Sequence, residues 1–507
     1  MTPVHRRTAC VLFVFFQALY GLTSSGNAFH VPDEFEVYYQ TEHLADAGDL
    51  SVPQALARNQ FFGLIGRDQK PYAPYGPLAA FLALPHHLAA RGVAWAVGVP
   101  RNTVAWGFLV SGLTMLNTAT AAALTVAGFY CAAILLGAAS ASALLMALLL
   151  GGASILWTYG TNFYSEAWQA AAFVWAAVAL LKRRSALAAA LIAVAGLIKV
   201  TGLVFVPGFF AAVALDSAIS WTDRQRTLLV LAGAVACACA IHVSWNLYRF
   251  GSPLEFGYNL QEMVPVLPAQ SFRLWDVPRG LLVQLATPGK SIFLWAPALV
   301  LSLMRLRSTP DWLAAGLGIS AVCGLVFYAA FLFPEGGYSH GPRHLVPIVP
   351  LLLLPAALPG RPLSRQLVFA CAAIGVAFAL TSTAVSFLQD QSLGTDFTKV
   401  GYYERINPPP GRSWLRYRFD YVPFARAMQS GQWPRSREVG AGLDFFWLHL
   451  ARARAGIPAA AVIPAWICWL LPVGWIALLV GSLGYAVSNN LLGPDIDAKT
   501  SAKVGTR

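Results

Sequence analysis

Apolar segments long enough to cross a lipid bilayer recur along nearly the whole of this 507-residue chain. A spanning helix requires about 20 mostly apolar residues, and the sequence offers about fourteen such segments. Only 11% of the residues are charged, against about 25% in a typical soluble domain. These features exclude a soluble protein and predict an all-α polytopic membrane protein, a bundle of about 12–14 transmembrane helices. The candidate spans are 8–24, 77–97, 103–118, 120–137, 140–158, 165–181, 186–199, 200–215, 227–246, 289–304, 312–331, 344–358, 366–388 and 457–486.

Two stretches are ambiguous, because 103–137 and 186–215 each fit one long helix or a tight hairpin of two short ones. The positions of Lys and Arg predict the orientation, since cytoplasmic connections are enriched in them. With the N-terminus in the cytoplasm, every predicted inner connection except the one near 138–140 is basic, and both termini lie inside. The inner basic positions are His5-Arg6-Arg7, Arg101, Lys182-Arg183-Arg184, Arg224, Arg226, Arg305, Arg307, Arg361, Arg365, Lys499, Lys503 and Arg507.

Three longer segments then lie on the extracytoplasmic side. The first outer loop, 27–76, is acidic, and the segment 247–288 is aromatic, rich in proline and expected to lie along the interface. The third, 389–456, is rich in Arg, but long loops cross the membrane largely regardless of their charge. The expected organisation is a transmembrane module over 1–388, an extracytoplasmic loop over 389–456, a last span over 457–486 and a cytoplasmic tail over 487–507.

The first candidate for chemistry is the acidic pair Asp33 and Glu34, just beyond the first span. A carboxylate held at a membrane surface can act as a general base on a hydroxyl. Low dielectric and neighbouring carboxylates raise the pKa of such a group toward a useful range. The alternative is structural, because Asp33 is also well placed to cap the helix that follows.

Aromatic and acidic residues at the extracytoplasmic ends of two further predicted helices extend this candidate site. Tyr72 and Tyr75 stand beside a stiff Pro/Gly turn and could stack on a sugar; the alternative is an aromatic belt at the membrane interface. Glu166 is the single acidic residue at the edge of a long apolar block, 102–215. A buried acid there indicates function, unless it serves as a favourable charge in the first turn of its helix.

Three cationic side chains are predicted on the extracytoplasmic side, although Lys and Arg are usually enriched on the cytoplasmic side. Lys290 and Arg343 each stand at the start of a helix, and Lys199 falls at the outer turn between two spans. Backbone donors at a helix N-terminus together with a cation form an anion site, for which a phosphate at the membrane surface is the obvious anion. The alternative is that these side chains reach out to lipid headgroups.

These strings, in this order, resemble the GT-C superfamily of membrane glycosyltransferases. Within it the chain is most similar to family 39 and its bacterial relatives, which use a phospholipid-carrier donor: protein O-mannosyltransferases, the lipid A aminoarabinose transferase and the rhizobial galacturonosyltransferases. The resemblance covers roughly 1–388. It rests on the strings Pro32-Asp33-Glu34, Tyr72-Ala73-Pro74-Tyr75-Gly76-Pro77-Leu78, Ser165-Glu166, Arg249-Phe250-Gly251-Ser252-Pro253-Leu254-Glu255, Pro288-Gly289-Lys290-Ser291 and Tyr338-Ser339-His340-Gly341-Pro342-Arg343-His344.

The resemblance implies a GT-C-like fold and a role for each matching residue. Asp33, with Glu34 beside it, falls at the catalytic centre, and Lys290 and Arg343 hold the phosphate of the lipid donor. Lys199, which belongs to none of these strings, is expected to join them from its place at the outer turn. Glu166, Tyr72, Tyr75, His340 and His344 are expected to contact substrate. The sequence departs from the family at His344, where a Tyr is more usual, and at 389–456, which matches no acceptor-binding domain.

The predicted function is therefore inverting transfer of a sugar from a polyprenyl-phosphate donor to an extracytoplasmic glycolipid, cell-envelope polysaccharide or protein. The expected location is a bacterial inner membrane, with no nucleic-acid partner and no cofactor, and a divalent metal is not favoured. Two alternatives stay open. A transporter or flippase is expected to carry charges deep within its helices, and a lipid-linked oligosaccharide ligase or polymerase would not need the acidic pair.

Overall fold

Helices make up nearly all of the described chain, as predicted. The computed structural model describes residues 1–26, 31–58, 61–101, 103–258, 272–287, 289–331, 334, 336, 339–384, 435–436, 440–441, 443–489 and 491. Within these ranges five helices are long and apolar enough to cross a membrane, and shorter apolar helices accompany them. The prediction of an all-α polytopic membrane protein is confirmed. The strands described are the two-residue pairs β1 (Leu64–Ile65) with β2 (Pro71–Tyr72) and β3 (Arg435–Ser436) with β4 (Gly440–Ala441).

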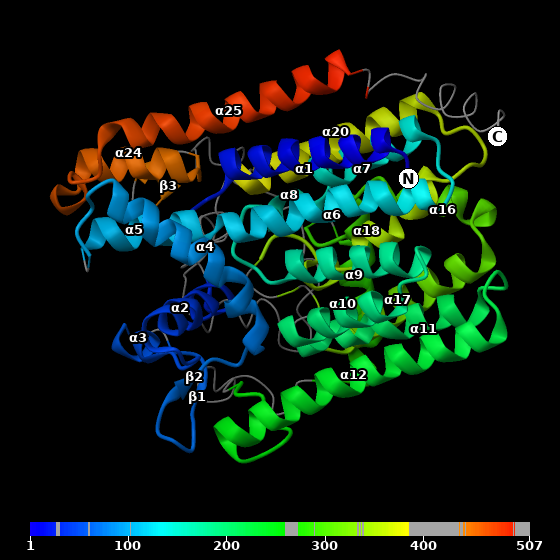
Figure 1. The fold of residues 1–507 in the computed structure, drawn as a ribbon, viewed down its shortest axis with the longest axis horizontal. Coiled ribbons are helices and arrows are strands. Elements are labelled where there is room, and N and C mark those ends of the chain that lie inside the picture. The colour runs from blue at the N-terminus through cyan, green and yellow to red at the C-terminus, as the bar shows by residue number, and fades with distance from the viewer. Residues whose placement is uncertain are drawn as a thin grey trace, which may run out of the picture.

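The long helices run side by side between two ends of a bundle (Figure 1). We call one the basic end, which holds residues 1–7, 182–184, 216–226, 305–309 and 358–365. We call the other the site end, which holds residues 31–58, 61–76, 161–166, 199, 250–258, 287, 289–291 and 339–343. The passes between them are α1 (Pro3–Thr23), α6 (Leu116–Leu135), α7 (Ser140–Gly152) with α8 (Ile155–Gly160), α9 (Glu166–Leu181), α10 (Ser185–Ile198), η1 (Val200–Phe205) with α11 (Val206–Leu215), α12 (Trp221–Phe250), α15 (Ile292–Trp295) with α16 (Leu299–Arg305), α17 (Asp311–Ala330), α18 (Val349–Leu352) with α19 (Leu354–Ala357), α20 (Arg365–Ala384) and α25 (Ala465–Ser488).

Both ambiguous stretches are resolved, and in opposite ways. Residues 104–135 form one long helix with a break at Met115, which keeps right-handed helical geometry (φ −64°, ψ −18°). Residues 185–215 form a hairpin instead. Its turn is at Lys199, and α11 returns to the basic end, where Asp216 pairs with Arg183 at 3.0 Å.

Residues 77–97 do not cross the bundle as expected. They form α4 (Pro77–Ala96), which starts beside the Lys199 turn of the 185–215 hairpin. From there α4 packs along α2 (Pro32–Ala47) and runs away from the bundle at the site end. Asp46, at the end of α2, pairs with Arg91 at 2.7 Å and with Arg101 at 3.4 Å. α5 (Val104–Thr114) then leads back into α6. The expected inner position of Arg101 is therefore wrong: it lies beside the acidic first loop. Two expected crossings, 77–97 and 103–118, are therefore absent. Because the loss of a pair of crossings leaves the direction of the next one unchanged, the later connections lie at the ends that were predicted for them.

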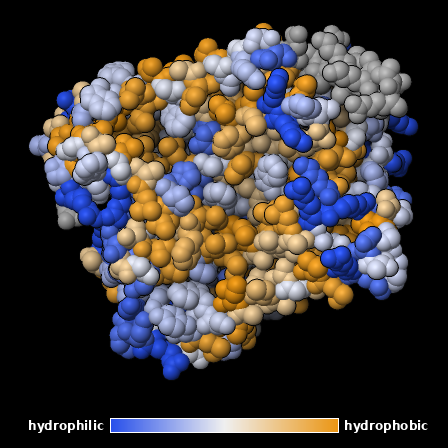
Figure 2. Space-filling view, viewed as in Figure 1, coloured by the Kyte–Doolittle hydropathy of each residue, from blue (hydrophilic) through white to orange (hydrophobic). Residues whose placement is uncertain are grey.

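Burial separates central from peripheral helices. In its most apolar window the helix 104–135 is 78% buried, against 17% for α12 and 22% for α25. Small residues allow close packing around α6, as at Gly128, where an added Cβ would lie 2.8 Å from Val174. α12 and α25 keep broad apolar faces exposed, which suits contact with lipid. Figure 2 shows hydrophobic residues over the middle of the molecule and hydrophilic ones gathered toward its two ends.

Short elements cover the site end. α2 and α3 (Pro53–Ala57) form the first loop with the β1–β2 hairpin, which rests on the end of α12 through a 2.7 Å bond from the Arg67 amide to the Arg249 carbonyl. α14 (Val277–Ala286) packs on α17, and α24 (Phe446–Gly456) packs on α5. Much of the expected loop 389–456 and nearly all of the expected tail 487–507 lie outside the described residues, as do Pro288 and Tyr338 of the motif strings.

Candidate active site

Four charged side chains from four separate segments meet at the site end; Asp33, Glu166, Lys199 and Arg343 are named here the charge cluster. Arg343 Nη1 lies 3.2 Å from Asp33 Oδ2, and Lys199 Nζ lies 3.8 Å from Asp33 Oδ1. Lys199 Nζ also donates to Glu166 Oε1 at 3.0 Å, and Arg343 Nε stands 3.6 Å from the same oxygen. The structure thus brings four predicted site residues together.

Each member of the charge cluster is held at the end of an element. Asp33 lies in the first turn of α2, which Pro32 helps to start, and Glu166 opens α9. Lys199 has extended backbone (φ −154°, ψ 120°) at the turn between α10 and η1. Arg343 lies in the short 3₁₀ helix η4 (Arg343–Leu345), and its guanidinium carbon sits 5.0 Å from the centre of the Tyr164 ring. Helix ends allow polar groups to meet without interrupting the apolar bundle.

Asp33 is the most accessible member of the charge cluster. Its side chain is 26% exposed, against 13% for Lys199, 9% for Arg343 and 3% for Glu166. Burial raises the pKa of Asp33, but Arg343 and then Lys199 lower it by more, so its pKa lies below the usual value. Asp33 is therefore a weak base while both cations remain beside it.

Lys290 and His344 border the charge cluster. The buried ammonium of Lys290 donates to the carbonyl of Ser339 at 2.6 Å. His344 stacks on Tyr328, with ring centres 4.4 Å apart, and neither of its ring nitrogens has a hydrogen-bond partner among the residues described. Burial, followed by the charges of Arg343, Lys199 and Lys290, holds the pKa of His344 well below its usual value. A neutral imidazole among three cations is suited to bind an anion.

The other predicted contacts divide between the charge cluster and the surrounding framework. Tyr75 is buried at the edge of the cluster, where burial and then Asp33 raise its pKa well above the usual value. The His340 ring packs at 5.8 Å from the Trp295 ring, and the His340 carbonyl accepts from Tyr159 at 2.8 Å. His340 therefore supports the loop that carries Arg343.

Two predicted residues have other contacts. Glu34 Oε1 accepts from the amide of Phe163 at 2.9 Å, so this side chain fixes α2 to the 161–165 turn. The structure does not bring Tyr72 to the charge cluster, because its hydroxyl donates to Asp68 at 2.7 Å and its ring packs against Trp245 and Phe250. Both residues hold the first loop in place.

Glu36 was not predicted, although it lies one helical turn after Asp33. It is fully buried; its Oε1 accepts from the amide of Phe62 at 2.6 Å, and its Oε2 has no partner among the described residues. Burial, partly offset by that hydrogen bond and supplemented by the charge of Asp33, raises the pKa of Glu36 to about 8. The i, i+3 spacing from Asp33 was the available signal.

We expect Glu36→Gln to change how stability depends on pH. A carboxyl group whose pKa is raised in the folded state contributes stability that is fully present below its unfolded pKa and is lost as pH rises through the folded value. The unfolding temperature of the wild type should therefore fall between about pH 5 and 8, and that of Glu36→Gln should fall less. Thermal unfolding across this range measures both slopes, and equal slopes would contradict the assignment.

The described residues include no group of three or more His, Cys, Asp and Glu side chains placed to hold a metal ion. At the charge cluster each carboxylate already faces a cation. The cluster as it stands can therefore bind an anion by exchange of ion pairs and can accept a proton on Asp33.

No protein-family model matches the chain, and no curated protein matches it. Three solved structures are similar to it. ArnT from Cupriavidus metallidurans in the apo state is 17% identical (TM-score 0.47), over 93% of this chain and 76% of that one. ArnT bound to undecaprenyl phosphate is 15% identical (TM-score 0.45), over 97% and 80%. The Archaeoglobus fulgidus oligosaccharyltransferase in the apo form is 12% identical (TM-score 0.45), over 83% and 64%. With TM-scores below 0.5, the proposal below rests on the geometry of the site.

Proposed function

We propose that this protein transfers a sugar, a hexose or a pentose, from a polyprenyl-phosphate donor to an acceptor hydroxyl. The observation that carries the proposal is the charge cluster: an accessible carboxylate paired with two cations, at the end of a bundle of apolar helices. The carboxylate can act as a base on the acceptor, and the cations can stabilise a leaving phosphate. A donor anchored in the bilayer would be held in position by its lipid.

The proposed reaction is a single displacement that inverts the anomeric carbon. The acceptor oxygen attacks that carbon while its proton passes to Asp33. The bond between the carbon and the phosphate oxygen breaks, and its electron pair leaves with the lipid phosphate. Arg343 and Lys199 stand where that charge develops, and the neutral ring of His344 supplies a further hydrogen bond. The acceptor is a glycolipid, an envelope polysaccharide or a protein.

Formal charges support the grouping of Lys290 with the charge cluster. Two carboxylates and two cations sum to zero, so a donor phosphodiester with one negative charge would leave the buried site negative without Lys290. After transfer the phosphate carries a second negative charge, while protonated Asp33 has lost one. Summed over the charge cluster, Lys290 and the phosphate, the formal charge is zero before and after the step. A site that conserves neutrality avoids the large cost of an unpaired buried charge.

The same contacts predict that donor binding activates the base. A phosphate that draws Arg343 and Lys199 toward itself reduces the stabilisation of ionised Asp33, so its pKa should rise in the complex. The acidic limb of kcat, which reports the complex, should therefore lie at higher pH than the acidic limb of kcat/KM, which reports the free enzyme. Rate profiles from about pH 4 to 8 test this, and coincident limbs would contradict it.

We propose that no divalent metal takes part, because Lys199 and Arg343 already occupy the positions facing the carboxylates. Activity should be unchanged after treatment with EDTA and should not increase when Mg²⁺ or Mn²⁺ is added back. A loss with EDTA that Mg²⁺ or Mn²⁺ restores would contradict this part of the proposal.

The placement of charge favours an enzyme over a transporter. In the passes that the structure describes, Asp, Glu, Lys and Arg stand near helix ends, whereas transport pathways place charge near the middle of the membrane. The involvement of Asp33 distinguishes the proposal from an oligosaccharide ligase or polymerase. By the positive-inside rule, the basic end and both termini face the cytoplasm, and the charge cluster faces outward from a bacterial inner membrane.

The test of the proposed function is release of free polyprenyl phosphate by the purified protein supplied with a panel of polyprenyl-phosphate sugars. We expect release that depends on the sugar and is faster when the acceptor is present. A protein that releases lipid phosphate from none of these donors would contradict the proposal. The panel also identifies the sugar.

A further inference from the structure

A cavity lies at the basic end, away from the charge cluster. It has a volume of about 460 Å³ and is bounded by the ends of α9 and α11, by α18 and the start of α19, and by the starts of α12 and α17. This volume falls within the range of small-molecule sites, about 300–1,000 Å³. Leu136, Leu181, Phe209, Val213, Leu313 and Leu317 line its interior. An apolar chain is the natural occupant of such a space.

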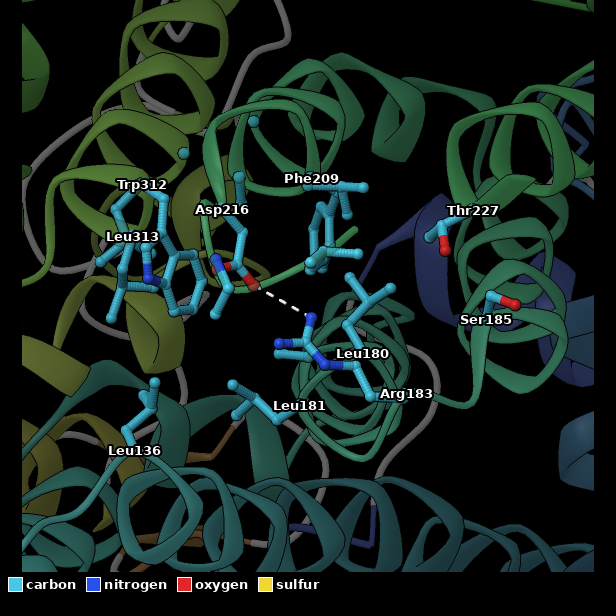
Figure 3. Close-up of a pocket in the computed structure, with 18 of the residues that line it drawn as sticks. Leu136, Leu180, Leu181, Arg183, Ser185, Phe209, Asp216, Thr227, Trp312 and Leu313 are labelled. Atoms are coloured by element: carbon cyan, nitrogen blue, oxygen red, sulfur yellow. Dashed lines mark hydrogen bonds and ion pairs between the residues drawn. The ribbon is translucent and has the colours of Figure 1, made fainter. Parts of the chain in front are cut away.

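The mouth of the cavity is polar and carries two arginines, Arg183 and Arg226, and two aspartates, Asp216 and Asp223. Arg183 and Asp216 bridge it with a 3.0 Å ion pair, which Figure 3 shows as a dashed line. Arg183 adopts φ 57°, in the left-handed region that residues other than glycine seldom adopt. Asp216 Oδ1 also accepts from the Ala218 amide at 3.0 Å, so this acid is already occupied.

The other acidic group at the mouth is occupied as well. Asp223 accepts from the Ser220 hydroxyl at 2.7 Å at the start of α12. Arg226, one turn further along α12, is exposed and lines the cavity. No hydrogen bond or ion pair joins its guanidinium to another residue within the described ranges. An anion at the mouth would therefore meet Arg226 and the outer nitrogens of Arg183.

We propose that this cavity binds an anionic phospholipid, with one acyl chain inside and the phosphate between Arg226 and Arg183. Basic pockets between transmembrane helices on the cytoplasmic side suit such headgroups. A polyprenyl tail reaching down from the charge cluster would fill the cavity but make no use of the arginines. The lipid would brace α11, which together with η1 leads from Lys199 to Asp216, against α12 and α17. The inference rests on the membrane fold and on the proposed orientation of its basic end, and it does not depend on sugar transfer.

Native mass spectrometry of the purified protein with phosphatidylglycerol, phosphatidylcholine or polyprenyl phosphate tests this. Wild type should retain phosphatidylglycerol in preference to phosphatidylcholine. Arg226→Gln should lower that retention about fivefold, as expected for one arginine near an anionic lipid. Leu313→Trp, which fills the cavity, should abolish it.

Arg307→Gln is the matched control, because Arg307 is exposed at the same end and does not line the cavity. Its retention should equal that of wild type. Equal losses in Arg226→Gln and Arg307→Gln would overturn the proposal, as would equal retention of the two phospholipids. Polyprenyl phosphate displaced by Leu313→Trp, with phosphatidylglycerol unaffected, would identify the cavity as a tail site instead. An unfolding temperature near that of wild type shows that each variant is folded.

Discussion

Asp33→Asn is expected to reduce sugar transfer about 10²–10⁴-fold, the usual contribution of a general base, while donor binding is retained. Asn keeps the shape of the side chain but cannot accept the acceptor proton. It also removes the carboxylate that pairs with Arg343 at 3.2 Å, so that this cation becomes more available to a phosphate. The Kd for the donor should therefore be unchanged or lower, whereas kcat falls. Steady-state kinetics and lipid binding on one preparation measure both.

Asp49→Asn is the matched control for this prediction. Asp49 belongs to the same first loop and pairs with Lys70 at 2.8 Å, away from the charge cluster. Its loss should leave both turnover and donor binding near wild type. A similar fall in kcat for both variants would mean that the loop tolerates no loss of charge. Asp33 would then have no special role.

Arg343→Lys is expected to weaken donor binding about 10- to 100-fold, which corresponds to the loss of one hydrogen bond to a charged group. Lysine keeps the positive charge but lacks the planar guanidinium group. In Arg343 this group faces both Asp33 and Glu166 and stacks on Tyr164. Turnover at saturating donor should fall as well, because the same group faces the leaving phosphate. Titration with polyprenyl phosphate gives the Kd directly.

Arg101→Lys provides the comparison, since Arg101 pairs with Asp46 at 3.4 Å on an exposed surface. We expect no change in its donor Kd, because exposed ion pairs contribute little. If Arg343→Lys bound donor as tightly as Arg101→Lys, the phosphate site would have to be sought elsewhere.

Much of the membrane fold could be predicted from local composition, because crossing a bilayer requires long apolar helices with paired backbone groups. The course of the chain at 77–118 could not. The helix α4 has the 20 residues of a span, but it packs along α2 at the site end. Because α2 and α4 are separated in the sequence, the contact between them leaves no local signal. The hairpin turn at Lys199 is likewise decided by the packing of α11 on α17.

At the site, residue type and side of the membrane were enough to select Asp33, Glu166, Lys199 and Arg343. Their distances were not predictable, because each comes from a different element. Glu34 follows Asp33 by one residue and therefore projects about 100° around the helix, toward Phe163. Glu36 lies one turn away from Asp33, on the same side of α2. It was missed because adjacency in sequence, and not helical spacing, guided the prediction. Helical spacing, more than adjacency in sequence, decides which acids meet.

The most direct test of the central claim follows the fate of the donor in sealed vesicles that contain the purified protein. A donor labelled on both its sugar and its lipid should be separated into free lipid phosphate and glycosylated acceptor. Vesicles that contain the Asp33→Asn variant should leave the labelled donor intact. An intact donor that moves from one leaflet to the other in both preparations would contradict sugar transfer and identify a flippase.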